Sequence, residues 1–156
     1  IIQMKSLDAR YLLVITCSQR KNESPGLLPA IDRYDGINYR IIRKAMRDGY
    51  LPKNLDILII SAKYGLLEQK SLIENYDQLM TKERAKELRN SISSLLAERI
   101  KLTKYNEIFL NIGKTYKMAL EGWDAGIGSD SLIVYANGGI GKKSSQMLHW
   151  LKVKKD

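Results

Sequence analysis

The sequence predicts a three-layer α/β/α fold around a mostly parallel sheet of about four to five strands. Two observations carry this prediction. Short apolar segments recur along the chain with almost no polar residues inside them, as in strands that are covered on both faces. Segments with helical periodicity lie between them, and this alternation is typical of βαβ units. Because such crossovers are right-handed, the helices are expected on both faces of the sheet.

Four segments have the length and composition of buried strands. Each is short, rich in Ile, Leu, Val or Tyr, and followed by small or polar residues that end it. The predicted strands are 11–16, 55–61, 107–112 and 131–136.

The intervening segments place apolar residues at helical spacing. Glycine follows the first and the third segment, as it commonly does at a helix C-terminus, and Thr81 is a good N-cap for the second. The helical patterns run from Ile37 to Met46, from Thr81 to Ile100, over 115–121 and over 142–152.

The length of 156 residues suits one α/β domain with its own core, spanning 1–156. No apolar run approaches the roughly 18 residues that cross a bilayer, and no signal peptide is recognised. One cysteine cannot form an internal disulfide, which suits a reducing compartment. We therefore expect a cytoplasmic protein with no membrane partner.

The chain is basic, with 26 Lys and Arg against 17 Asp and Glu and a net charge of +9. Such a balance favours polyanionic partners, above all a nucleotide or nucleic acid. A solvated basic surface without such a partner is the alternative interpretation.

In open parallel sheets, ligands bind beyond the carboxyl ends of the strands. The residues that follow the predicted strands are small, hydroxyl-bearing or cationic, so Cys17 is expected to face a shared ligand edge. These residues are Cys17, Ser18 and Lys21 after the first strand, Ser61, Lys63, Tyr64 and Gly65 at the second, 113–115 after the third, and 137–143 after the fourth.

Cys17 has two interpretations. Cations close to a thiol favour its reactive form, so Cys17 is a candidate nucleophile. The only histidine, His149, lies far along the chain in the last predicted helix, so Lys63 or a carboxylate is the candidate base. The alternative is a small buried residue at a tight turn.

The turn ANGGIGKKSS after the last strand is a candidate anion site. Gly138 and Gly139 let backbone N–H groups approach a ligand, and Lys142 begins a helix whose N-terminus favours anions. The turn is not a Walker loop, because Ala136 and Lys143 stand where that motif needs Gly and Ser or Thr. An ordinary strand-to-helix turn is the alternative.

Two acids, Glu74 and Asp77, flank Tyr76 in an otherwise basic segment. They are candidates for acid–base chemistry or for reading a polar edge of a ligand. Alternatively they form ion pairs with Lys63 or Arg84 and fix the loop.

Nine tyrosines against one phenylalanine suit a wet binding surface. Tyr34 either stacks on a base or packs against the sheet. Asp35, in a turn with Gly36, is a candidate cap for the first helix. One His and one Cys without metal-ligand spacing, and no Rossmann fingerprint, predict no metal and no cofactor.

Four stretches together resemble a family of bacterial and phage proteins that is similar to the peroxide-stress protein YaaA. They are VITCSQRK, PAIDRYDGINYR, ILIISAKYGLLEQKSLIENYD and the arginine of TKERA. The same layout distantly resembles the core domain of archaeosine synthase and DpdC, a DNA-modification protein that acts on cyano-deazaguanine. The resemblance implies a compact fold close to that of uracil-DNA glycosylases, and a link to nucleic acid or modified nucleobases. It implies site residues at Cys17, Ser18, Lys21, Tyr34, Gly36, Ser61, Lys63, Tyr64, Gly65, Glu74, Tyr76, Asp77 and Arg84.

We therefore expect a YaaA-like enzyme or nucleotide-binding protein that acts on a nucleobase or nucleotide in nucleic acid modification or in the response to damage or stress. Two chemistries are open: addition of Cys17 to a nitrile, or glycosidic-type cleavage by water that a carboxylate activates. The alternative is a non-catalytic DNA- or RNA-binding protein with a basic surface. A third possibility is a small protein partner in a larger system.

Overall fold

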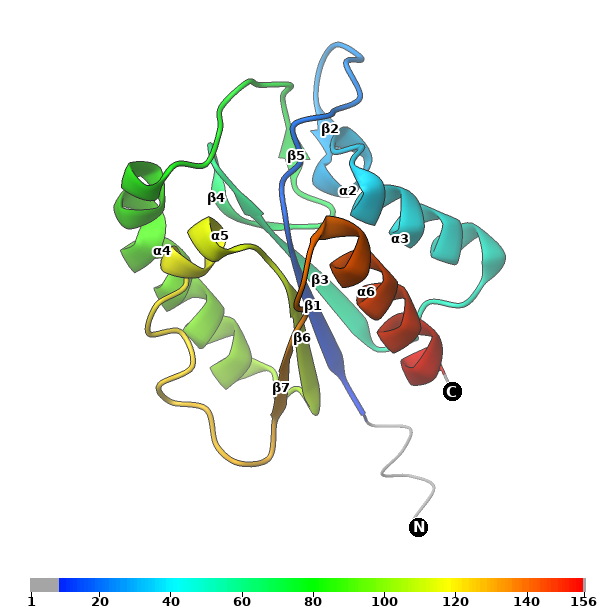
Figure 1. The fold of residues 1–156 in the computed structure, drawn as a ribbon, viewed down its shortest axis with the longest axis vertical. Coiled ribbons are helices and arrows are strands. Elements are labelled where there is room, and N and C mark those ends of the chain that lie inside the picture. Colours follow the sequence, from blue (N-terminus) through cyan, green and yellow to red (C-terminus); the bar gives the residue numbers. More distant parts are fainter. Residues whose placement is uncertain (1–8, 156) are drawn as a thin grey trace.

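The computed structural model describes residues 9–155, and residues 1–8 and 156 lie outside this description. A central sheet runs through the molecule with helices on both faces (Figure 1). The strands are β1 (Tyr11–Thr16), β2 (Leu28–Pro29), β3 (Leu55–Ser61), β4 (Gly65–Glu68), β5 (Leu72–Ile73), β6 (Glu107–Asn111) and β7 (Leu132–Tyr135). The helices are α2 (Ala30–Arg33), α3 (Ile37–Asp48), α4 (Lys82–Leu102), α5 (Lys114–Met118) and α6 (Ile140–Lys155).

The five strands of the main sheet follow the order β4-β3-β1-β6-β7. The pairs β3–β1, β1–β6 and β6–β7 are parallel, so the carboxyl ends of these four strands meet at one edge. β4 is antiparallel to β3. The mostly parallel three-layer architecture predicted from the sequence is therefore confirmed, and all four predicted strands are present within a residue of their expected ends.

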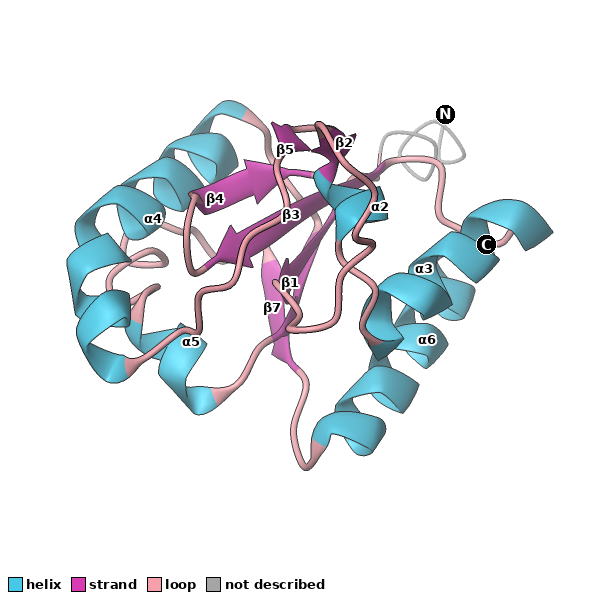
Figure 2. Cartoon of the chain, turned by 90° about the horizontal axis from the view of Figure 1, so that it is seen from above, coloured by secondary structure: helices cyan, strands magenta, loops and turns pink. Residues whose placement is uncertain are grey.

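The alternating residues of β1 pack into two separate cores. Leu13 and Ile15 pack in the core that includes residues of α3 and α6, whereas Leu12 and Val14 pack in the core that includes residues of α4. Figures 1 and 2 show α3 and α6 together on one side of the sheet, and α4 and α5 on the other. The near-continuous apolar character of the strands is explained by this double cover.

The helix boundaries reflect local chemistry. The Thr81 hydroxyl accepts a hydrogen bond from the Arg84 N–H at 3.0 Å, which confirms the predicted N-cap of α4. Gly49 ends α3 with a φ of 77°, in the left-handed region that glycine adopts at low cost. α5 is shorter than the predicted 115–121, and α6 is longer than the predicted 142–152. Within the described residues, no helix is long and apolar enough to cross a membrane.

A small antiparallel ribbon of β2 and β5 was not predicted. Beside it, the Arg33 side chain is fully buried, and its guanidinium group donates to the backbone carbonyls of Asn22, Ser24, Gly26 and Ile73. Arg33 thereby fixes the long loop that leaves β1 against β5. The loop is held by this side chain together with backbone hydrogen bonds, including an antiparallel bridge between Lys21 and Tyr34.

Candidate functional site

A pocket of about 430 Å³ lies where the carboxyl ends of β1 and β6 meet the first turns of α3, α5 and α6. We call it the Cys17 pocket. Its lining includes cations, amides, a thiol and two phenols, but no carboxylate. The lining residues are Thr16, Cys17, Ser18, Gln19, Arg20, Gly36, Ile37, Asn38, Tyr39, Asn111, Ile112, Gly113, Tyr116, Ile140 and Lys143.

A larger hollow of about 700 Å³ lies between the end of α4 and the loop before β7. It contains none of the residues that follow the carboxyl ends of β1, β3 or β6. It is larger than the Cys17 pocket, but its lining contains no thiol and no phenol. The position of a ligand site in a parallel sheet therefore favours the Cys17 pocket.

The Cys17 thiol and the Tyr116 hydroxyl lie in contact at the pocket wall. The distance from Sγ to Oη is 3.3 Å, and either atom can be the donor. Burial raises the pKa of Tyr116, and the proximity of Cys17 raises it further. Tyr116 therefore stays protonated at neutral pH and keeps a proton available beside the sulfur. The prediction that Cys17 faces the ligand edge agrees with this position.

Two asparagines supply amide groups to the same pocket. Asn111 is only 4% exposed, at the end of β6, and its amide nitrogen donates to the Met147 sulfur at 3.6 Å. The carbonyl oxygen of the Asn38 amide accepts a hydrogen bond from the Ser144 hydroxyl at 2.7 Å, which joins the first turn of α3 to α6. An amide carries both donors and an acceptor, so this wall is suited to the polar edge of a planar ligand.

Cations lie around the pocket. Lys143 donates to the Ile112 carbonyl at 3.1 Å, and Arg20 is 69% exposed on its side chain. Lys142 lies outside the lining, because its side chain packs over Gly138, which has a φ of 92°. Neither Gly138 nor Gly139 lines the pocket, so the turn contributes through its next residues, Ile140 and Lys143.

A second group of polar residues, the tyrosine cluster, lies beside Cys17 toward β3. The Tyr76 hydroxyl is 2.6 Å from that of Tyr34 and 2.9 Å from that of Ser61. The Ser61 oxygen accepts the N–H groups of Lys63 and Tyr64 at 3.2 and 3.0 Å. With both lone pairs so engaged, Ser61 has its own proton available for Tyr76, and in the Tyr76–Tyr34 pair either hydroxyl can be the donor. The cluster is a connected chain of hydroxyl groups.

Burial sets the protonation of this cluster. It raises the pKa of Tyr34 to about 12, and it raises the pKa of Tyr76 as well. The Lys21 ammonium lies 4.5 Å from the centre of the Tyr76 ring. Burial lowers the pKa of Lys21, while the proximity of Cys17 and Asp77 raises it. The phenols are thus neutral hydrogen-bonding groups at physiological pH.

A side chain of α4 fixes the turn that follows β3. Arg84 donates to the carbonyls of Ala62 and Lys63 at 2.7 and 3.0 Å. Gly65 follows with a φ of 81°, and the chain reverses into β4. Lys63 lies over the Tyr64 ring at 5.2 Å. Arg84 therefore positions this turn through the backbone.

Two expectations from the sequence are corrected by the tyrosine cluster and its surroundings. Tyr34 has no exposed surface, so its ring packs against the sheet and is not available to stack on a base. Tyr64, at 37% exposed, is available. Among the described residues, neither Glu74 nor Asp77 forms an ion pair, so the proposed pairing with Lys63 or Arg84 was wrong.

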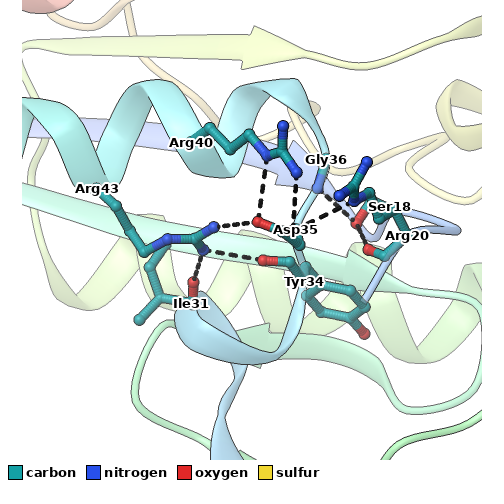
Figure 3. A network of polar contacts seen from close by, with 8 residues as sticks. All are labelled: Ser18, Arg20, Ile31, Tyr34, Asp35, Gly36, Arg40 and Arg43. Carbon is teal, nitrogen blue, oxygen red and sulfur yellow. Dashed lines mark hydrogen bonds and ion pairs between the residues drawn. The ribbon is translucent and has the colours of Figure 1, made fainter. Parts of the chain in front are cut away.

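Asp35 is not the cap of α3. The N-cap is Gly36, and no side chain caps this end. Instead the Asp35 carboxylate pairs with Arg43 at 2.6 Å, with Arg40 at 3.1 Å and with Arg20 at 3.3 Å (Figure 3). Three guanidinium groups offered a stronger set of partners than the free N–H groups of the helix.

The same junction fixes the loop after β1 to the start of α3 (Figure 3). The Ser18 hydroxyl donates to the Arg20 carbonyl at 2.6 Å and accepts the Gly36 N–H at 3.2 Å. A Cβ on Gly36 would lie 2.8 Å from the Ser18 Cβ, so a side chain there would force the two segments apart. Ser18 and Gly36 thus shape the pocket wall through close backbone contact.

We expect Asp35→Asn to lower the melting temperature at neutral pH by about 2–4 °C, the shift that about 1 kcal/mol produces in a domain of this size. The Arg40 hydrogen bond, with the nearby positive charges, lowers the pKa of Asp35. A carboxylate with a lowered pKa stabilises the fold above its unfolded value of about 4, and this is lost as the pH falls through the folded pKa.

The difference between the wild type and Asp35→Asn should therefore shrink as thermal melts are recorded from pH 7 down to pH 3. Asp48→Asn is the matched control, since this carboxylate pairs only with the exposed Lys44. A difference that stays constant with pH would show that the charge of Asp35 is not what stabilises the junction.

Most of the predicted site residues come together. Cys17, Ser18 and Gly36 line the pocket, and Lys21, Ser61, Tyr64 and Tyr76 lie in or beside the tyrosine cluster. Sequence reasoning missed Tyr116, Asn38 and Asn111, whereas Lys143 was expected at this edge as part of 137–143. The polar Asn111 at the end of an otherwise apolar strand was a usable signal, whereas Tyr116 lay in a segment that was interpreted only as a helix.

No group of three or more His, Cys, Asp or Glu side chains in residues 9–155 is arranged to hold a metal ion. His149 is exposed on α6 and is absent from the Cys17 pocket lining. A Cys–His pair is therefore not part of this site.

Fold and site define a three-layer α/β protein with a pocket at the carboxyl edge of its sheet. The chain belongs to a family of unknown function, DUF6884, whose family model matches residues 12–152. Comparison with curated proteins gave no match. Among solved structures the chain is similar to AF0587, a protein of unknown function, with a TM-score of 0.55 and 11% identity. The match covers 92% of this chain and 45% of that one, and it shows the fold alone.

Proposed function

We propose that this protein binds a nucleotide or nucleobase in the Cys17 pocket and modifies the base through its thiol, in nucleic acid modification or the response to damage or stress. The observation that carries the proposal is the contact between the Cys17 thiol and the protonated Tyr116 hydroxyl at the wall of the pocket. A nucleophile and a proton donor side by side are the minimum for addition to an unsaturated carbon.

The other lining residues suit a nucleotide. Asn38 and Asn111 offer amides to the polar edge of a base, and Arg20 and Lys143 offer positive charge to a phosphate. The volume of about 430 Å³ falls within the ordinary range for small-molecule sites. The sequence resemblance to YaaA, to archaeosine synthase and to DpdC supports the same ligand class.

Of the two chemistries left open by the sequence, the pocket favours addition to a nitrile. The Cys17 sulfur would form a bond to the nitrile carbon, and one C–N π bond would break. The nitrile nitrogen would take the proton that the thiol loses, giving a thioimide. Tyr116 is positioned to pass this proton, because its hydroxyl contacts the sulfur. Glycosidic cleavage needs a carboxylate to activate water, and neither Glu74 nor Asp77 lines the pocket.

A thermal-shift titration against nucleoside monophosphates, nucleobases and cyano-deazaguanine tests the proposal. Bound ligand stabilises the fold by about 2.7 kcal/mol at 100 times its dissociation constant, which is several degrees. Lys143→Met should reduce this shift, because Lys143 lines the pocket, whereas the neighbouring Lys142→Met should leave it unchanged.

Turnover of cyano-deazaguanine to a covalent adduct, detected as a mass increase of the protein, should require Cys17 and vanish in Cys17→Ser. The proposal fails if no mononucleotide or base produces a shift, or if Lys142→Met and Lys143→Met reduce it equally.

A further inference from the structure

We propose that the outward face of α3 and α6 binds the phosphodiester backbone of a single-stranded polynucleotide, one nucleotide of which enters the Cys17 pocket. This inference rests on the proposed function and names its substrate class: a nucleotide within a polymer, in place of a free one. Charge, exposure and the position of the pocket each support it.

The positive charge of the chain is concentrated on this face. α3 and α6 together carry nine Lys and Arg side chains and one carboxylate, Asp48. α4, on the other side of the sheet, carries six Lys and Arg and three Glu. A concentrated patch of one sign is what binding to a polyanion requires.

The cations are presented outward along both helices. On α3, Arg40, Lys44 and Arg47 are exposed and recur at helical spacing, opposite the buried Tyr39, Ile42 and Ala45. On α6, Lys152 is exposed and lies 5.4 Å from the centre of the Tyr50 ring, just beyond the end of α3. The two helices lie side by side in both views of the molecule (Figures 1 and 2), and the contact of Lys152 with Tyr50 joins α6 to the end of α3.

Arg43 and Lys154 are engaged by Asp35 and by the largely buried Glu107, whereas Arg47, Lys142 and Lys152 form no ion pair among the described residues. Lys44 and Asp48 form an exposed pair, which contributes little and exchanges readily for a phosphate. Arg20, Arg40 and Arg43 share the single carboxylate of Asp35, so two positive charges remain uncompensated at that junction. The face can therefore neutralise several phosphates without breaking a buried ion pair.

This face leads to the pocket. The first turn of α3 supplies Ile37 and Asn38 to the lining, and the first turn of α6 supplies Ile140 and Lys143. Arg20 belongs to the lining and pairs with the same carboxylate as Arg40. A polynucleotide backbone that lies along the two helices toward their N-termini therefore reaches the pocket without leaving this face.

The test measures binding of fluorescent single strands of about 12 nucleotides, one RNA and one DNA, from 50 to 300 mM salt. We expect affinity to fall steeply with salt and to exceed that of a mononucleotide at low salt. Lys44→Gln, Arg47→Gln and Lys152→Gln combined should lower the salt slope by about 2 and the low-salt affinity at least about tenfold. Mononucleotide binding should stay unchanged, because none of the three lines the pocket.

The matched control combines Lys82→Gln, Lys86→Gln and Lys101→Gln on α4, which removes the same charge from the other side of the sheet. It should leave the slope and affinity unchanged. The inference is overturned if both triple variants lose affinity equally, since net charge alone would then act. It is also overturned if oligonucleotides bind no more tightly than mononucleotides, or if anionic vesicles bind the α3–α6 face as well as the oligonucleotides do.

Failure of the proposed function gives a different pattern. In that case the α3–α6 variant would weaken oligonucleotide binding, Lys143→Met would not, and mononucleotides would produce no thermal shift. The protein would then have a binding surface for the polymer but no pocket for a base. The ratio of RNA to DNA affinity identifies which polymer is preferred, because the two strands share the same phosphodiester chemistry.

Discussion

Arg33→Ala is expected to lower the free energy of unfolding by about 3–4 kcal/mol, a large part of the 5–15 kcal/mol that typically stabilises a domain. The side chain is fully buried, and its guanidinium group donates to four backbone carbonyls. Alanine leaves these acceptors without donors and opens a cavity between the loop and β5. Urea unfolding measures the loss as a lower midpoint at unchanged slope.

Two companion variants separate the causes. Arg33→Met keeps much of the volume but none of the hydrogen bonds, so it should lose nearly as much stability as alanine. Asp32→Ala, at an exposed neighbouring position, should stay within about 0.5 kcal/mol of the wild type. The Nε atom of Arg33 has no partner, and the desolvation of a buried cation opposes its hydrogen bonds. A loss below about 1 kcal/mol for alanine would mean that desolvation cancels them.

Arg33 also marks the limit of sequence reasoning about this fold. The four parallel strands were predictable, because strands buried on both faces must be apolar throughout. An arginine is normally exposed, and nothing local signals that four carbonyls converge on Arg33. β4 was missed for the opposite reason: its apolar residues continue those of β3, and only the reversal at Gly65 separates the two strands.

The candidate site was predictable as an edge but not as a set of contacts. Topology alone brings Cys17 and Ser61 to the carboxyl edge of the sheet, since both end parallel strands. The partners of each side chain depend on tertiary packing. Asp35 had a plausible local role as a cap, and three arginines from two segments outcompeted it. Tyr34 had a plausible role in stacking on a base, but its ring is buried in the core.

Modification of Cys17 by N-ethylmaleimide is expected to abolish ligand binding in the pocket, with an apparent affinity lower by at least about 100-fold, or about 2.7 kcal/mol. The chain has one cysteine, so the reagent labels a single atom, the sulfur at the wall of the pocket. The adduct would occupy the space in the pocket beside the thiol that the base needs. The measurement compares thermal shifts with nucleoside monophosphates before and after stoichiometric labelling.

Cys17→Ser separates occlusion from chemistry. This variant has no thiol, so exposure to the reagent should leave its ligand-induced shift intact, while it should form no covalent adduct with cyano-deazaguanine. Ligand present during labelling should slow the reaction of the wild type, because base and reagent compete for one space. A labelled wild type that still binds mononucleotides would place the ligand elsewhere. A thiol that resists labelling in the free protein would instead identify Cys17 as a small packed residue at a turn, and the nucleophile would be lost from the proposed mechanism.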